Sequence, residues 1–389
     1  MLRLVYLYRN LTRNNMRTAL TCAAVALPIV IYVLSTAVID GLDRFLDNAA
    51  KQLRLVVSHR ASIINPLPSG YRSKIESLDP ERTRLRSVCG MGWIGGRIEN
   101  DSRLLSTLAV QADTFPATFP EFKLTPEELA AWHRDRQAII VGRATASQFG
   151  WKVGDRISII PSLPPYTPME FHVISTAPHA ADPVTNFCRL DYFDEVRKEA
   201  DVPTDIVSFF FVKCADKEAL DHFGGAIDEL FAHSPDQTRT QDEKAFMTEF
   251  ITQQFDLPTN LTILAAVTIF VAVMAAANTM SMNFRDRINE LAVLRSIGFS
   301  GLALAGLILC ESLLLCGLGG LIGAGIPFVA FNFTSLKELT VPVIQAIIVE
   351  PNVCVEAFLV ALAVGVVAAV WPAIAATRLT VVAALRNLE

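Results

Sequence analysis

Four long apolar runs constrain this chain more than any other feature, because each is long enough to cross a membrane as a helix. Spanning the hydrocarbon core of a bilayer takes about 20 apolar residues. The runs cover residues 18–39, 261–280, 301–331 and 357–376, and the third contains a single charged residue, Glu311. We therefore predict four transmembrane helices, at residues 18–39, 257–282, 301–331 and 357–377.

The first run follows a basic segment, as the apolar part of a secretory signal does. It is longer than that part usually is, and no small-residue cleavage site follows it, which favours an uncleaved anchor. Pro28 lies inside the run and predicts a bend in the helix rather than a functional hinge.

A polar stretch, residues 40–256, separates the first two apolar runs and holds the hydrophobic share of the chain to 52%. Its composition predicts a mixture of strands and helices, with Thr125 and Asp216 as helix caps. Runs of β-branched and aromatic residues predict strands at 53–59, 103–110, 138–141, 156–160, 170–175 and 207–212. Residues 40–52 and 242–255 are predicted to be helical stalks. The expected fold is a membrane bundle of four transmembrane helices, with a large α+β domain between helices 1 and 2.

The arginines predict how the chain is oriented, because cytoplasmic flanks of membrane helices collect Lys and Arg. They gather in the basic N-terminus 1–17, in the loop 283–300 and in the tail 378–389. The connection 332–356 instead holds one lysine against three glutamates. We expect both termini in the cytoplasm of a bacterium, the chain in its inner membrane, and the α+β domain on the periplasmic side.

Motifs that would indicate an enzyme are missing from the sequence. There is no phosphate-binding string G-x-x-x-x-G-K-[ST], no H-E-x-x-H and no G-x-S-x-G. The six histidines are scattered and the seven cysteines form no C-x-x-C, so a zinc site has little support. We expect no catalytic residue, metal or cofactor on this chain. For Cys89, Cys188 and Cys214 in the α+β domain, buried thiols are favoured over a disulfide between two of them.

The loop at 283–300 is charged but keeps the patterning of a helix. Its apolar residues recur near helical spacing, and Arg285, Glu290 and Arg295 fall on other faces. A charged helix at the inner face of a membrane is either an interfacial helix or an element that fits a groove on a partner. The pattern alone leaves both readings open.

The string R-x-R-x-x-E-x-A-V-L-R-S-I-G in this loop resembles the coupling segment of FtsX/MacB-type permeases of ABC transporters. Three other segments resemble the same family in the same order: residues 10–20, VGRATASQFGWKVGDRISI at 141–159, and PAIAATRLTVVAALRNL at 372–388. The resemblance implies that the loop docks on an ATPase. The implied docking residues are Arg285, Arg287, Glu290, Leu291, Leu294, Arg295, Ile297 and Gly298.

The chain departs from the family pattern in its tail, where Val381 replaces a usual proline and Ala383 a usual acidic residue. Because the sequence has no phosphate-binding loop, the resemblance implies a separate ABC ATPase subunit that binds ATP and Mg²⁺. It also implies a homodimer or a heterodimer with a related permease, and it allows a periplasmic adaptor or outer-membrane partner. Membrane lipids are a further expected partner, and nothing indicates nucleic acid.

Glu311 and a group of glycines stand out inside the third apolar run. A carboxylate at membrane depth costs a few kcal/mol to insert. Glu311 is therefore either a functional group that pairs with a helix end or across a dimer, or a group close enough to the interface to stay hydrated. Gly319 and Gly323 form a G-x-x-x-G, which permits close packing either within the bundle or between subunits.

The resemblance implies a mechanism in which an ATPase dimer moves helices 1 and 2, and with them the external domain. Such motion suits efflux of a periplasmic substrate or extraction of a membrane-anchored one such as a lipoprotein. Two other functions remain open. One is control of an extracytoplasmic hydrolase through protein contact, and the other is a ligand-binding membrane sensor that works without an ATPase.

Overall fold

A computed structural model describes residues 15–99, 101, 103–177, 183–254, 256–334 and 347–378. The chain divides into two compact units. The helical unit comprises Met1–Gly41, Asp256–Leu339 and Ile347–Glu389, and the sheet unit comprises Leu42–Phe255 and Thr340–Ala346. The predictions for the start of the basic N-terminus, for residues 335–346 and for the tail with Val381 and Ala383 lie outside the described residues.

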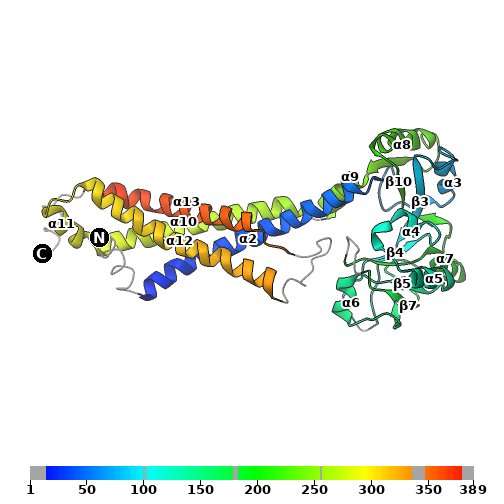
Figure 1. Cartoon of the computed structure of the whole chain (residues 1–389), viewed down its shortest axis with the longest axis horizontal. Coiled ribbons are helices and arrows are strands. Elements are labelled where there is room, and N and C mark those ends of the chain that lie inside the picture. Colours follow the sequence, from blue (N-terminus) through cyan, green and yellow to red (C-terminus); the bar gives the residue numbers. More distant parts are fainter. Residues whose placement is uncertain are drawn as a thin grey trace. The chain divides into compact units, whose positions relative to one another are not determined.

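Within the described part of the chain, four helices are long and apolar enough to cross a membrane, as predicted (Figure 1). They are α2 (Asn15–Lys51), α10 (Leu257–Asp286), α12 (Gly301–Phe333) and α13 (Pro351–Thr377). Helix α2 continues through Pro28, and it includes most of the segment predicted as the first stalk. Helix α13 begins before the predicted span because Pro351 occupies its first turn, where the missing N–H of proline costs nothing.

The short helix α11 (Ile288–Ser296) lies between α10 and α12. The predicted coupling helix 283–300 is therefore too long, since residues 283–286 are the last turn of α10. Arg287 separates the two helices because its backbone leaves the helical region, with φ −113° and ψ 10°. Helix α12 then starts after Ser300, whose hydroxyl accepts a hydrogen bond from the N–H of Ala303 at 3.2 Å.

Glycines on two sides of α12 let neighbouring helices approach closely. A Cβ added to Gly323 would lie 2.6 Å from the carbonyl oxygen of Ala26 in α2, and one added to Gly319 would lie 3.0 Å from that of Cys22. The predicted G-x-x-x-G thus packs within the chain, against α2. On another side of α12, a Cβ added to Gly320 would lie 2.5 Å from the Cβ of Ala361 in α13.

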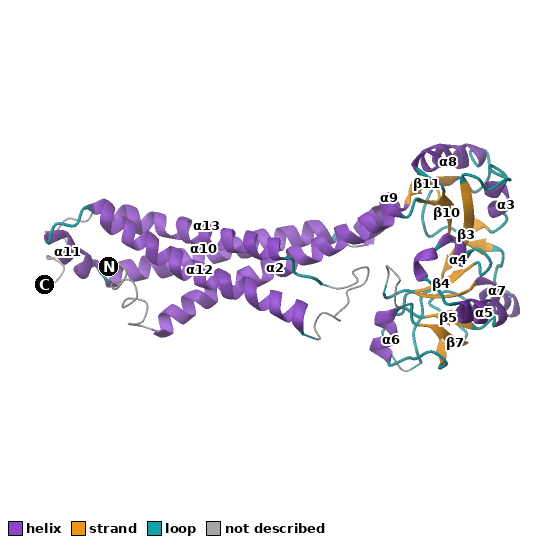
Figure 2. Cartoon of the chain, in the orientation of Figure 1, coloured by secondary structure: helices purple, strands orange, loops and turns teal. Residues whose placement is uncertain are grey.

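The sheet unit is built on one nine-stranded mixed sheet, with strands in the order β11-β1-β10-β3-β4-β8-β5-β7-β6 (Figure 2). Neighbouring strands are antiparallel except the pairs β4/β8 and β5/β7. The strands are β1 (Arg54–His59), β3 (Leu85–Trp93), β4 (Thr107–Val110), β5 (Ala138–Ile140), β6 (Arg156–Ile159), β7 (Met169–Ser175), β8 (Asn186–Arg189), β10 (Phe209–Cys214) and β11 (Thr238–Asp242). A separate pair joins β2 (Leu67–Pro68) to β9 (Ile206–Val207).

Alternating side chains divide the core of this unit between the two faces of the sheet. On β1, Leu55 and Val57 join a cluster with residues of α3 (Tyr71–Glu76), α7 (Leu190–Glu199) and α8 (Lys217–Leu230). Val56 joins the opposite cluster, with residues of α4 (Phe115–Thr118), η1 (Pro120–Phe122), α5 (Pro126–Arg134) and α9 (Glu243–Gln254). Four membrane-length helices and this mixed unit confirm the predicted fold class.

Local signals placed several of these elements correctly. Thr125 and Glu128 form a capping box at the start of α5, and the Asp216 carboxylate accepts the N–H of Ala219 at 2.7 Å at the start of α8. The 141–159 motif contains α6 (Arg143–Phe149) and β6. The predicted strand 103–110 begins only at Thr107, because Leu104 makes just an isolated bridge.

Candidate functional site

Helix α11 is held against the ends of three membrane helices by its inward-facing side chains. Leu291 is 3% exposed and belongs to a buried cluster with Phe284 of α10, Leu304 and Ile308 of α12, and residues of α13. Ile288 and Leu294 are partly buried against the same cluster. These contacts place α11 in one packed cluster with side chains of α10, α12 and α13.

The outward face of α11 carries exposed apolar side chains. Val293 is 53% exposed and Ile297 is 72% exposed, and Asn289 is also exposed. These three residues are each four positions apart, so their side chains lie on one face of the helix, with Ile297 directly after its last residue. Gly298 ends this face with φ +107°, a conformation that favours glycine. We call Asn289, Val293 and Ile297 the outer face of α11.

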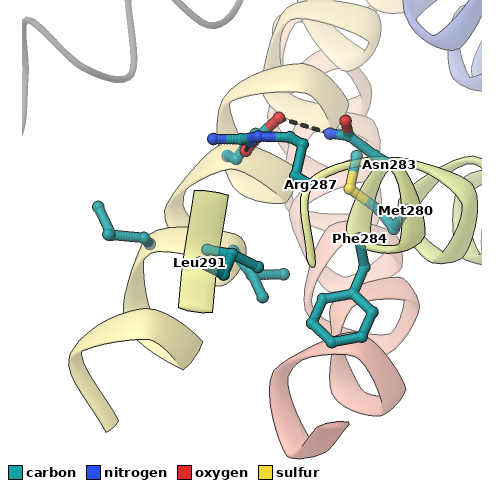
Figure 3. A pocket seen from close by; sticks show the side chains of 8 residues that line it. Met280, Asn283, Phe284, Arg287 and Leu291 are labelled. Carbon is teal, nitrogen blue, oxygen red and sulfur yellow. Dashed lines mark hydrogen bonds and ion pairs between the residues drawn. The ribbon is translucent and has the colours of Figure 1, made fainter. Parts of the chain in front are cut away.

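A buried polar group joins the break between α10 and α11 to α12 (Figure 3). Arg287 Nη1 lies 2.8 Å from Glu311 Oε2, and Asn283 Nδ2 donates to Glu311 Oε1 at 2.6 Å. The Arg287 and Glu311 side chains are only 12% and 9% exposed. Arg287 Nε also lies 3.4 Å from Glu290 Oε2. Both oxygens of the membrane carboxylate are thus satisfied within the chain, as a buried charge requires.

A cavity of about 20 Å³ adjoins this polar group. It is large enough for about one water molecule and far too small for a substrate, since ligand pockets measure about 300–1,000 Å³. Its lining combines the polar group with apolar side chains: Met280, Asn283, Phe284, Arg287, Leu291, Leu307, Ile308 and Glu311. Within the described ranges, no group of three or more His, Cys, Asp or Glu is placed to hold a metal.

The structure separates the predicted docking residues into two sets. Arg285, Ile297 and Gly298 are exposed, whereas Arg287 and Leu291 are engaged inside the chain. Leu294, Arg295 and Glu290 are half-buried. Arg295 turns toward the junction of α12 and α13, because a Cβ on Gly301 would meet its Nη1 at 2.7 Å and the Thr377 carbonyl oxygen at 3.0 Å. The docking role of the eight residues stays a prediction, and the structure divides them between exposed positions and contacts inside the chain.

Three contributors to the site were missed in the sequence. Asn289 and Val293 belong to the outer face, and assigning the helix positions face by face would have found them, since residues 289, 293 and 297 are each four positions apart. Asn283 supports Glu311 from 28 residues away, and no local sequence signal indicates that contact.

The four membrane-length helices indicate a multi-pass membrane protein. Residues 262–381 match the family model of the FtsX-like permease C-terminal domain. The chain therefore carries an FtsX-like permease domain, which extends over most of α10, all of α11 and α12, and α13. This match confirms the resemblance to permeases of the FtsX/MacB type.

Solved structures similar to the chain are domains of such proteins. The periplasmic region of MacB from Actinobacillus actinomycetemcomitans is 9% identical, with 51% of this chain and 92% of that chain covered and a TM-score of 0.33. The extracellular domain of the noncanonic ABC-type transporter YknZ from Gram-positive bacteria is 10% identical, with 48% and 99% covered and a TM-score of 0.33. Similarity at this level carries no conclusion about function. No curated protein matches the sequence.

Proposed function

We propose that this chain is the membrane subunit of an ABC transporter and that it transmits movement from a separate ATPase to its sheet unit. In this proposal ATP and Mg²⁺ bind to the ATPase, which contacts the outer face of α11. The sheet unit lies on the periplasmic side and acts on a periplasmic or membrane-anchored substrate. Two copies of the chain, or one copy and a related permease, provide the two docking sites that an ATPase dimer requires.

The division of α11 into two faces is the observation that carries this proposal. Its inner face is packed into the ends of three membrane helices through Leu291, and its outer face leaves Val293 and Ile297 exposed. Apolar side chains exposed on a helix that links two membrane helices suit either a partner protein or the membrane interface, and this proposal assigns them to the ATPase. A partner that moves α11 would therefore move α12 and α13 with it.

The polar group at Arg287 adds a second connection between α11 and the membrane helices. A displacement of the α10–α11 break must carry Glu311 along or separate a buried ion pair, which leaves two buried charges without partners. The cavity beside this group is too small to hold a substrate. Both observations support transmission of force rather than passage of a substrate through the helices of one chain.

Purification of the tagged chain from its native membrane in mild detergent tests whether an ATPase docks on the outer face of α11. Co-eluting proteins are identified by mass spectrometry, and ATP hydrolysis is measured. We expect a stoichiometric P-loop ATPase with the unmodified chain and its loss with the double variant Val293→Glu and Ile297→Glu. Ile64→Glu is the control, because Ile64 is an exposed apolar residue of the sheet unit and its replacement leaves α11 unchanged.

If the double variant still co-purifies with the ATPase, the ATPase does not dock on the outer face of α11. A clean preparation without an ATPase would favour a membrane sensor, and a stable complex with a hydrolase in place of a transport defect would favour the regulatory function.

A further inference from the structure

The chain enters and leaves the sheet unit at neighbouring points. Helix α2 ends at Lys51, and β1 begins at Arg54. Strand β11 ends at Asp242, and α9 begins at Glu243. Strands β1 and β11 are paired antiparallel, with Leu55 opposite Asp242. The C-terminal end of α2 and the N-terminal end of α9 are thus brought together at one edge of the sheet.

A buried ion pair joins the first residue of β1, which closely follows α2, to the first residue of α9. Arg54 Nε lies 2.6 Å from Glu243 Oε2, and Arg54 Nη2 donates to Glu243 Oε1 at 2.9 Å. The two side chains are 4% and 8% exposed. The guanidinium therefore holds the first residue of α9 through a bidentate contact, which fixes orientation as well as distance.

The remaining side of the guanidinium is also occupied. Arg54 Nη1 lies 2.6 Å from Glu121 Oε1 and donates to the carbonyl oxygen of Thr118 at 3.1 Å. The Phe119 ring lies below it, with its centroid 4.2 Å from Arg54 Cζ. One arginine thus connects β1, α9 and the segment from α4 to η1, and its rigid donor fork suits this better than the single ammonium of a lysine.

A second contact joins α9 to α2 itself. Lys244 Nζ of α9 lies 2.7 Å from Asp47 Oδ1 of α2, on the exposed surface. The ammonium of Lys213 in β10 also donates to the carbonyl oxygen of Gln52, directly after α2. The exposed pair contributes little stability by itself, but it shows that the side chains of the two helices are in contact.

From these contacts we infer that Arg54 is a positioning residue that makes the end of α2 and the start of α9 move as one body. The inference rests on the proposed function, because it concerns how movement of the membrane helices reaches the sheet. With the two helices joined, a displacement of either is passed to the sheet. Without the joint, the two helices separate and the displacement is lost.

The burial of charge at this position supports a geometric role over a purely stabilising one. Replacing a buried ion pair by apolar residues of similar volume is often neutral or stabilising. A hydrophobic pair would therefore hold the domain together equally well, but it would lack the directional bonds that set the angle between β1 and α9. We therefore assign to the ion pair the role of fixing the orientation of α9 relative to β1.

Hydrogen exchange of the full chain, followed by mass spectrometry, tests whether the joint exists. Arg54→Lys keeps the positive charge and removes the bidentate contact. We expect it to speed amide exchange in residues 42–51 and 243–254 together by about tenfold, as the loss of a charged hydrogen bond implies. Arg239→Lys is the matched control, since Arg239 of β11 makes an exposed ion pair with Glu249 of the same helix α9. Unchanged exchange in either segment of the Arg54→Lys chain would overturn the inference.

A covalent link tests the coupling role with a readout that a loss of stability alone would not change. Asp47→Cys and Lys244→Cys are joined by a reducible bifunctional thiol cross-linker, which spans the length of the lysine side chain, in the complex with its ATPase. The change in exchange of the sheet unit on adding ATP and vanadate is then measured. In the chain with Arg54, we expect the nucleotide-dependent change in exchange to be the same with and without the link. In the Arg54→Lys chain, we expect this change to be absent when the link is reduced and to return when the link is formed. If the link abolishes the nucleotide-dependent change in exchange in the chain with Arg54, the two helices must separate during the movement, and the inference is overturned. If the link does not restore this change in the Arg54→Lys chain, Arg54 does not act by joining the two helices.

The proposed function and the positioning role of Arg54 can be overturned independently. If no ATPase accompanies the chain, the proposed function fails, while the exchange of residues 42–51 and 243–254 in the Arg54→Lys chain still decides whether the joint exists. If an ATPase binds and drives a change in the sheet unit that is insensitive to Arg54→Lys, the proposed function stands and the positioning role is overturned.

Discussion

The three cysteines of the sheet unit show how burial sets the chemistry of a residue. Cys89, Cys188 and Cys214 are buried and free. Loss of hydration raises the pKa of the Cys89 and Cys214 thiols to about 12 and also raises the pKa of Cys188. The thiolate is the reactive form, so almost none is present at neutral pH. The structure thus agrees with the buried-thiol reading of these residues.

We expect maleimide to label none of these three thiols in the folded chain and all of them after unfolding in denaturant without reductant. Mass spectrometry of proteolytic fragments measures the labelling residue by residue. Ser296→Cys on α11 provides an exposed thiol as the positive control. Failure of two of the three to react after unfolding, reversed by a reductant, would show a disulfide instead.

At the scale of the element, the glycines of α12 give a matched pair of positions. A Cβ at Gly323 would meet the backbone oxygen of Ala26 at 2.6 Å and Ile29 Cβ at 2.8 Å, whereas one at Gly325 meets nothing within 4 Å. We expect Gly323→Ala to lower the free energy of unfolding by about 1–3 kcal/mol, because the neighbouring backbone must shift. Gly325→Ala should be neutral or slightly stabilising, since alanine favours helix over glycine by about 1 kcal/mol.

Thermal unfolding of the two glycine variants in the same detergent measures the difference. Equal unfolding temperatures would mean that α2 does not pack against Gly323 in the membrane protein.

The polar connection between α10, α11 and α12 makes a second prediction at this scale. Arg287→Met removes the cation beside Glu311 and leaves a buried carboxylate, which should cost about 3–5 kcal/mol. Arg285→Met is the control, because Arg285 lies on the exposed side of the last turn of α10. The exchanged pair Arg287→Glu with Glu311→Arg should recover part of the loss, because opposite charges again face each other.

Unfolding in detergent and the yield of folded protein report the effect of the Arg287 variants. If Arg287→Met and Arg285→Met behave alike, the ion pair does not stabilise this end of the helices.

How far the sequence predicts an element depends on whether its cause is local. Caps at Thr125 and Asp216 and the apolar spans are encoded in neighbouring residues, so they were found. Strand β11, with the sequence TRTQD, is polar and owes its conformation to pairing with β1, so it carries no local signal. The same holds for the site: helical patterning found α11, but the contact between Arg54 and Glu243 joins residues 189 positions apart.

For the whole molecule, the lengths of the helices bear on where α11 lies. Helix α12 has 33 residues, so it is about 50 Å long at a rise of about 1.5 Å per residue. The hydrocarbon core is about 30 Å thick, so a substantial part of α12 extends beyond it. Helix α11 packs on the N-terminal turns of α12 through Leu304 and Ile308. We expect these turns and α11 to lie outside the core, on the side that collects arginine.

We expect the sheet unit and α11 on opposite faces of the membrane, because one membrane-length helix, α10, separates them along the chain. With membrane-impermeant maleimide, Asn65→Cys in the sheet unit should react in intact spheroplasts, and Ser296→Cys should react only in inside-out vesicles. Both positions are exposed, so access depends on the membrane and not on folding. The reverse pattern would invert the orientation predicted from the arginines, and reaction of both from one side would mean that α10 does not cross.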